Sequence, residues 1–301
     1  MPDARKTFPA ASGGSDTLKG LGLMAFGFFC YSTSDMLAKL LTESMHPVQV
    51  AWVRQFGLLT GIVVLLALHG TRIAHSSRPG LQIVRGLTVV AASAGFVGAV
   101  AFVPLADAVA VSFLAPFLVT ILGAIVLGER SGLHRWAAVI FGFVGTLIVV
   151  RPGFGVFHPA ILLVVLAAFA FATRQIVSRV LAGVDSIATT VFYSGLTAVV
   201  VLTLPLPFFW TFPAGGRELA LMAAMAVAAG LGELAIMRAL DIAEATVLSP
   251  LQYTLMIWST MWGFLVFAQL PDAWTLAGTG LIILSGMYTL IREGRRARAP
   301  R

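Results

Sequence analysis

The strongest constraint on the fold is a series of long apolar runs that are separated only by short polar loops. The run from Ala108 to Gly128 holds 21 residues and contains no charge. At about 1.5 Å per helical residue it reaches roughly 30 Å, the thickness of the hydrocarbon core of a bilayer. The sequence therefore predicts an all-α membrane protein with ten transmembrane helices, at about 18–42, 47–69, 80–103, 107–128, 133–151, 158–180, 186–208, 217–240, 244–268 and 273–291.

The composition of the 301-residue chain agrees with this interpretation. Hydrophobic residues make up 58% of the chain and charged residues only 11%, whereas about 25% of a soluble domain is charged. The basic residues lie in loops and tails, as the orientation of a membrane protein requires, so the lipid bilayer and not a nucleic acid is the expected partner. The single cysteine, Cys30, excludes an internal disulfide.

The distribution of Lys and Arg predicts the orientation of the chain. If the N-terminus is cytoplasmic, 14 of the 20 Lys and Arg residues fall in cytoplasmic segments and two, Arg151 and Arg217, fall outside. The positive-inside rule then places both termini in the cytoplasm. Five spans in each half make the second half enter from the opposite side, and such inverted repeats commonly share a site near the midplane.

Two helix hairpins of the chain resemble each other. Residues 105–109 (LADAV) correspond to residues 242–246 (IAEAT), and VSFLAP at 111–116 corresponds more loosely to LSPLQY at 248–253. A hairpin that recurs in a membrane chain indicates two structural repeats.

These residues carry a resemblance to a known family. The pattern LADAV…SF.AP…LGER…W..…G..G in residues 104–153 is similar to that of EamA-type carriers of the drug/metabolite transporter superfamily. The resemblance implies ten helices in two inverted five-helix repeats, but it implies no particular substrate because the family carries many. The organisation that follows is a disordered cytoplasmic tail, two EamA repeats and a basic cytoplasmic tail, at 1–17, 18–152, 153–292 and 293–301.

The chain carries no recognisable catalytic motif. The five histidines lie near span ends or in loops, and the sequence contains no HExxH, GxSxG or P-loop. We therefore predict that the protein is not an enzyme, needs no cofactor or metal, and is not driven by its own ATP hydrolysis. An integral membrane enzyme would need converging His, Ser or metal ligands, and a channel would not need helices interrupted at matching places.

Charged residues inside spans are costly and commonly face a cavity or a partner, so they are candidate site residues. Asp35 and Lys39 are four residues apart and share a helix face. This spacing leaves open a structural ion pair and a site for a cation or a proton. Glu233 either pairs with Arg238 or Arg54, or exchanges a proton or contacts a substrate amine.

Three arginines inside the predicted spans remain. Arg54 either bonds to a neighbouring helix or provides the counter-charge for an anionic substrate group. Arg174 is a candidate for the same cavity. Arg85 lies nearer the cytoplasmic surface, and we expect its side chain to snorkel there.

Polar, aromatic and proline residues near mid-depth complete the predicted substrate-binding set. Pro116 and Pro250 each remove a backbone hydrogen bond from a span, and interrupted helices in matching places are typical of transporter sites, although a plain packing kink is the alternative. The other candidates could bond or stack on a substrate: Tyr31, Ser112, Ser249, Gln252, Tyr253 and Trp258.

The sequence and the resemblance together predict a secondary transporter in the inner membrane of a bacterium that works by alternating access. The resemblance makes export of amino acids or related metabolites the first hypothesis. Uptake of a vitamin or a nucleoside-like solute, such as riboflavin or S-adenosylmethionine, is the second. The sequence leaves open whether the carrier is a monomer or a homodimer.

Overall fold

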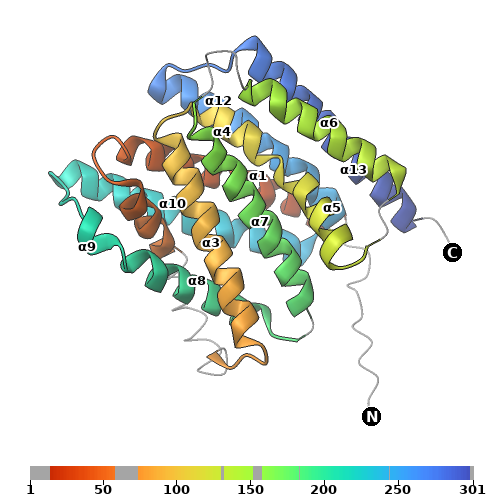
Figure 1. Ribbon diagram of the computed structural model, residues 1–301, viewed down its shortest axis with the longest axis horizontal. Coiled ribbons are helices and arrows are strands. Elements are labelled where there is room, and N and C mark those ends of the chain that lie inside the picture. Colours follow the sequence, from red (N-terminus) through yellow and green to blue (C-terminus); the bar gives the residue numbers. More distant parts are fainter. Residues whose placement is uncertain are drawn as a thin grey trace.

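The computed structural model describes residues 14–57, 74–129, 132–151, 158–182, 184–243 and 245–298, which are almost entirely helical and form no β-strand (Figure 1). Helical residues 47–57 follow the first helix. The other elements are α1 (Gly14–Leu41), α3 (Pro79–Val100), α4 (Leu105–Ser112), α5 (Ala115–Val126), α6 (Leu133–Val150), α7 (Ile161–Leu181), α8 (Ile187–Thr203), α9 (Leu206–Phe209), α10 (Gly216–Ile242), α11 (Ala245–Leu248), the 3₁₀ helix η2 (Ser249–Tyr253), α12 (Thr254–Phe267) and α13 (Ala273–Arg298).

Within the described residues, seven helical segments are long and apolar enough to cross a membrane, so the chain is a multi-pass membrane protein. They are Asp16–Leu41, Pro79–Val100, Leu105–Val126, Leu133–Val150, Ile161–Leu181, Gly216–Ile242 and Ala273–Arg292. The three other predicted spans correspond to helical residues 47–57, to α8, and to α11, η2 and α12 together. The predicted continuation of the second span, 58–69, lies outside the described residues.

Several helix ends differ from the predicted ones. Helix α1 begins before the predicted start at residue 18, and α13 continues to Arg298, beyond the predicted end at residue 291. The predicted span 186–208 is divided, because α8 ends at Thr203 and α9 begins at Leu206. Pro205 lies at this break, where it has no N–H to donate to a continuing helix.

The helices pack in pairs that join the two halves of the sequence. Helix α1 packs on α10, α3 on α7, and α6 on α13. Glycines permit the closest of these contacts, since a Cβ added to Gly145 would lie 2.8 Å from the carbonyl oxygen of Gly278, and one added to Gly278 would lie 2.6 Å from that of Gly145. Small residues at a helix interface let backbones approach this closely in a membrane.

The two ends of the helix bundle differ in composition and packing. We call the end of the bundle at which α3 is followed by α4 the distal end, and the opposite end, where α13 finishes, the terminal end (Figure 1). Most of the large buried core cluster lies in the distal half, where the chain turns between helices. Its members there include Met36, Leu37, Leu41, Met45, Val50, Val53, Val97, Val100, Val103, Leu105, Val109, Ile161 and Val164.

A buried lysine ties two helices together at the distal end. The Nζ of Lys39 donates to the carbonyl oxygens of Val100 and Val103, at 3.0 and 2.6 Å, so it ties α1 to the end of α3. Of the two alternatives that the sequence left open for Asp35 and Lys39, the structure does not form the ion pair, because the lysine side chain reaches free carbonyl oxygens at a helix end instead.

An ion pair joins the last residue of the first half to the loop before α13. The Nη2 of Arg151 lies 2.6 Å from Oδ2 of Asp272, and Oδ1 of Asp272 accepts from the backbone N–H of Thr275 at 2.8 Å. Burial alone would raise the pKa of Asp272, but the hydrogen bonds of Thr275 and Arg151 together with the arginine charge lower it below its ordinary value.

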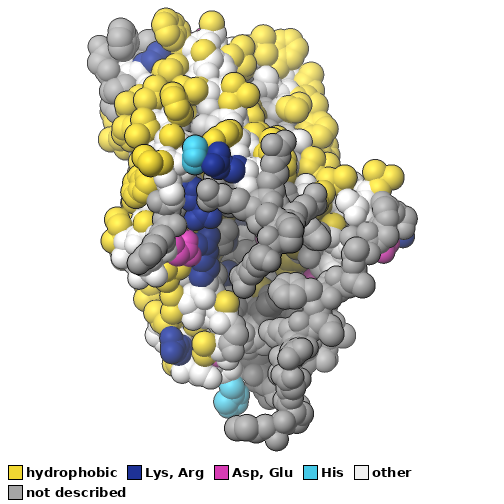
Figure 2. Space-filling model, turned by 90° about the vertical axis from the view of Figure 1, so that its right-hand side faces the viewer, with side chains coloured by type: hydrophobic (Ala, Val, Ile, Leu, Met, Phe, Trp, Pro, Cys, Tyr) yellow, Lys and Arg dark blue, Asp and Glu magenta, His cyan; other side chains and the backbone are white. Residues whose placement is uncertain are grey.

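The terminal end has a small buried cluster, which is formed by Met24, Ala239, Ala243 and Leu248. Its loops are joined by polar contacts, and Asp185 accepts hydrogen bonds from Ser76, from the N–H of Ser77 and from Gln82. Burial opposes these bonds, but they outweigh it and lower the pKa of the carboxyl. Figure 2, which views the molecule from the right-hand side of Figure 1, shows Lys and Arg side chains in a narrow band, with an acidic side chain beside them and apolar side chains to the left.

Candidate functional site

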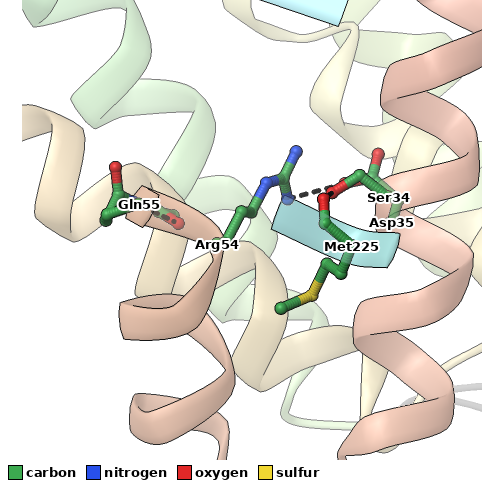
Figure 3. Close-up of polar contacts among 6 residues, drawn as sticks. Ser34, Asp35, Arg54, Gln55 and Met225 are labelled. Carbon is green, nitrogen blue, oxygen red and sulfur yellow. Dashed lines mark hydrogen bonds and ion pairs between the residues drawn. The ribbon is translucent and has the colours of Figure 1, made fainter. Parts of the chain in front are cut away.

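A buried ion pair joins α1 to helical residues 47–57. The Nη1 of Arg54 lies 2.7 Å from Oδ1 of Asp35, and the two side chains are 16% and 7% exposed. Figure 3 shows Arg54 pointing at Asp35, while Gln55 points to the other side of its helix and donates to Ser93 of α3 at 3.3 Å. Arg54 and Asp35, both predicted site residues, therefore neutralise each other.

The second in-span carboxylate meets a tyrosine. The hydroxyl of Tyr31 on α1 donates to Oε2 of Glu233 on α10, and Ser34 donates to the carbonyl oxygen of Met225 on the same pair of helices. The sequence left open a pair of Glu233 with Arg238 or with Arg54; in the described part of the chain Glu233 meets Tyr31 instead, and Arg54 pairs with Asp35. Glu233 retains acceptor capacity beyond this bond, because an ionised carboxylate can accept about four hydrogen bonds.

A further predicted site residue, Arg174, lies on α7. Arg174 on α7 places its guanidinium 4.5 Å from the centre of the Phe171 ring, and its Nε is buried and has no hydrogen-bond partner among the described residues. Of the predicted site residues, the contacts therefore join Tyr31 to Glu233 and Asp35 to Arg54.

Arg85 is held in place by the two helices that α3 packs against. Its Nε donates to Ser178 on α7 at 2.8 Å, and its Nη1 donates to Ser194 and, at 3.4 Å, to the carbonyl oxygen of Thr190 on α8. The expectation that Arg85 snorkels is therefore wrong. The sequence carries no periodic signal that would pair these serines with an arginine about a hundred residues away.

The two prolines interrupt their spans as the repeat predicts. Helix α4 ends at Ser112 and α5 begins at Ala115, with Pro116 in its first turn. In the second half, Pro250 lies within the 3₁₀ segment η2 between α11 and α12. A proline has no N–H, so the helical ladder cannot run unbroken through either position.

The two interruptions lie against each other. The ring of Phe113, in the break between α4 and α5, meets the ring of Tyr253, the last residue of η2, with centroids 5.2 Å apart and planes at 66°. Edge-to-face pairs of this kind are favourable contacts. Tyr253 is also buried against α13, since a Cβ on Gly286 would overlap its hydroxyl oxygen. Each half thus contributes one interrupted helix to a common junction.

An aromatic cluster joins α1 of the first half to α12 of the second half. Phe29 packs edge to face on Trp258 at 5.2 Å and lies 5.9 Å from the ring of Trp262. The indole N–H groups of both tryptophans are buried and have no hydrogen-bond partner among the described residues. Trp258 was a predicted site residue, whereas Phe29 and Trp262 were not identified.

The remaining predicted residues lie at the interruptions. Ser112 donates its hydroxyl back to the carbonyl oxygen of Val109 at 2.7 Å, while Ser249 and Gln252 belong to η2. A third carboxylate was overlooked at the distal start of α4, where Asp107 accepts from Thr275 at 2.9 Å. Within the described residues, no three His, Cys, Asp or Glu side chains could together hold a metal ion.

Repeated apolar helices, an interrupted helix from each half and a cluster of in-span charges define a class of protein, the multi-pass membrane transporters of small molecules. The model of the EamA-like transporter family matches residues 18–151 and again residues 158–291. The chain therefore belongs to the EamA-like transporter family, which is a family of carriers and not of enzymes.

Relatives of known function are transporters. The chain is 28% identical over 293 residues to an S-adenosylmethionine uptake transporter of Rickettsia felis, which covers 97% of this chain and 96% of that protein. It is 28% identical to the pseudopaline exporter CntI of Pseudomonas aeruginosa, over 90% and 95% of the two chains. It is 30% identical to a riboflavin transporter of Vibrio cholerae, over 66% and 67% of the two chains.

A solved crystal structure has a similar fold. Its chain superposes with a TM-score of 0.58 at 20% sequence identity, over 96% of this chain and 100% of that chain. At this low sequence identity the similarity supports a shared fold and nothing more.

Proposed function

We propose that the protein is a secondary carrier of the bacterial cytoplasmic membrane, with ten spans in two inverted repeats and both termini in the cytoplasm. The observation that carries this proposal is the contact between Phe113 and Tyr253, which joins an interrupted helix of each repeat near mid-depth. Inverted repeats with broken helices at their interface are the usual architecture of a carrier site. The repeat boundaries that we propose remain 18–152 and 153–292.

The packing supports one state of an alternating-access cycle. The distal half holds most of the buried core and the bonds of Lys39 and Arg151, whereas the terminal end has only a small buried cluster. With the termini in the cytoplasm, this state is closed toward the outside. Opening the distal end would require those contacts to break while the terminal end closes.

The substrate that we propose first is S-adenosylmethionine. Support comes from relatives of that function that match nearly the whole chain, and from acidic and aromatic side chains at the site. S-adenosylmethionine has cationic groups that Glu233 can bind and a flat base that suits Trp258 or Tyr253. Export of an amino acid or a related metabolite remains the second candidate, which the similarity to an exporter supports.

The roles that we propose follow from the contacts of each residue. Glu233, with Tyr31 as its donor, binds a cationic group or exchanges a proton, and Asp35 with Arg54 forms the charged wall of the site. Pro116 and Pro250 shape the two breaks, and the residues around them contact the solute. These are Ser112, Ser249, Gln252, Tyr253 and Trp258.

Uptake into proteoliposomes tests the substrate. Purified protein is reconstituted, and entry of labelled S-adenosylmethionine is measured against empty liposomes and in competition with amino acids and riboflavin. The proposal expects saturable uptake that unlabelled S-adenosylmethionine suppresses and riboflavin does not. Uptake no faster than in empty liposomes would reject this substrate, and competition by an amino acid alone would favour the second candidate.

A further inference from the structure

A lysine near the distal end of α1 is directed into the protein. Lys39 lies two residues before the end of α1, and it is 9% exposed. Within the part of the chain that the structure describes, its ammonium contacts only neutral groups. A lysine near the end of a membrane helix commonly extends to the water, so a buried ammonium at this position points to a function.

The ammonium of Lys39 meets the distal ends of two other helices. It donates to the carbonyl oxygens of Val100 and Val103 at 3.0 and 2.6 Å, and it lies 5.3 Å from the centre of the Phe267 ring. Val100 ends α3, Val103 belongs to the turn that leads into α4, and Phe267 ends α12. Carbonyl oxygens at the end of a helix carry partial negative charge, and an aromatic face attracts a cation, so these groups all favour a lysine.

These contacts connect the two interrupted hairpins at their distal side. Helix α4 precedes the break at Pro116, and α12 follows the break in η2. The α3–α4 turn belongs to the first half of the chain and α12 to the second half. One side chain on α1 therefore holds an element of each half at the distal end of the bundle.

The lysine joins helices that pack on each other only slightly. Helix α1 packs mainly on α10 and α3 mainly on α7, whereas α1 and α3 make few contacts with each other. Breaking the bonds of Lys39 therefore leaves both helix pairs intact. Because the acceptors are neutral, release of the ammonium leaves no unpaired carboxylate behind, and water that enters an open distal end can solvate it.

We propose that Lys39 is the latch that keeps the distal entrance of the carrier closed, by holding the α3–α4 turn and the end of α12 against α1. This inference rests on the proposed function and deepens it, because it names the side chain that must let go before the distal end can open. In the state that the structure describes, the latch is engaged at both carbonyl oxygens.

Two cysteine reporters test the latch in a chain that carries Cys30→Ala. Val103→Cys keeps the backbone carbonyl that binds Lys39, and its side-chain position is 5% exposed. Ala239→Cys places a thiol in the small buried cluster of the terminal end, where Ala239 is fully buried. Labelling by a small water-soluble maleimide is timed on purified protein in detergent, without solute, for the parent chain, Lys39→Met and Lys39→Arg.

We expect Lys39→Met to raise the labelling rate of Val103→Cys at least about tenfold, because the lost hydrogen bonds involve a charged group. Lys39→Arg keeps a cation at the end of α3, so it should raise the rate by no more than about threefold. Ala239→Cys should label no faster in either variant. The control Lys19→Gln breaks an exposed ion pair within α1, and it should leave both rates unchanged.

A second variant keeps the test decisive if Lys39→Met does not fold. Phe267→Leu removes the ring beside the ammonium and leaves the lysine in place. It should raise the labelling rate of Val103→Cys about threefold, as loss of a contact between a cation and an aromatic face implies. An unchanged rate in this variant would then count against the latch.

Three outcomes would overturn the inference. They are an unchanged rate for Val103→Cys in Lys39→Met, an equal acceleration at Val103→Cys and Ala239→Cys, and a rate in Lys39→Arg as high as in Lys39→Met. An equal acceleration at both reporters would show that Lys39 only stabilises the fold. The proposed function is judged separately by uptake, so a wild-type carrier that transports S-adenosylmethionine while one of these outcomes holds loses only the role of Lys39.

Discussion

The buried pair between Asp35 and Arg54 provides the sharpest prediction about stability. Replacing Asp35 with Asn, or Arg54 with Gln, leaves the other charge buried without its partner. Two unit charges about 4 Å apart attract by about 4 kcal/mol at an effective dielectric constant of about 20, and removal of one partner of a buried pair typically costs about 3–5 kcal/mol. We therefore expect each single substitution to lower the apparent melting temperature by on the order of 10 °C.

The double variant separates this cause from simple loss of packing. With both charges removed, neither side chain is left as an unpaired ion, so Asp35→Asn/Arg54→Gln should be more stable than the sum of its two single variants predicts, by about 2 kcal/mol. The matched control is the exposed pair of Glu129 and Arg179, which are 38% and 48% exposed at 2.8 Å. Each of the matched substitutions Glu129→Gln and Arg179→Gln should lower the free energy of unfolding by less than about 1 kcal/mol.

The assay is thermal unfolding in detergent at a fixed scan rate, because the apparent melting temperature of a membrane protein depends on that rate. Strictly additive effects at Asp35 and Arg54 would refute the reasoning. A loss at the control pair as large as at the buried pair would refute it as well, since burial would then not be the cause.

Three other predictions test different parts of the proposal. In separate cysteine variants of a chain whose native Cys30 is buried, an impermeant thiol reagent should label Ser44→Cys only from the periplasm and His75→Cys only from the cytoplasm, and reversed labelling would invert the topology. Replacing Pro116 or Pro250 with Ala should slow uptake more than it lowers the melting temperature, whereas wild-type turnover would leave these prolines as packing kinks. In vesicles, Glu233→Gln should lose rate or its response to an imposed pH gradient; a variant that keeps both would make Glu233 structural.

The positions of the helices could be predicted from the sequence because local chemistry determines them. Span-length apolar runs require internally bonded helices in lipid. A proline inside a helix removes one backbone hydrogen bond, so the breaks near Pro116 and Pro250 could be predicted from the position of these two residues in the sequence. The extension of α13 to Arg298 could not be read from hydropathy, because hydropathy marks the apolar part of a helix and not its polar end.

The partners of the charged residues could not be predicted from the sequence. The spacing of Asp35 and Lys39 shows that they share a face of α1, but not which neighbouring helix offers a better partner. Lys39 reaches the carbonyls at the end of α3, and Asp35 meets Arg54 instead. Glu233 and Tyr31, separated by 202 residues, meet only because α10 packs on α1.

Counterflow tests the central claim, that the protein is an alternating-access carrier, most directly. Proteoliposomes loaded with unlabelled S-adenosylmethionine are diluted into a trace of labelled compound, and internal label is followed over time. A carrier exchanges one solute for the other, so the account predicts a transient accumulation of label above the equilibrium level, which disappears in liposomes loaded with buffer alone. A monotonic approach to equilibrium that is the same with and without internal substrate would contradict it and favour a channel.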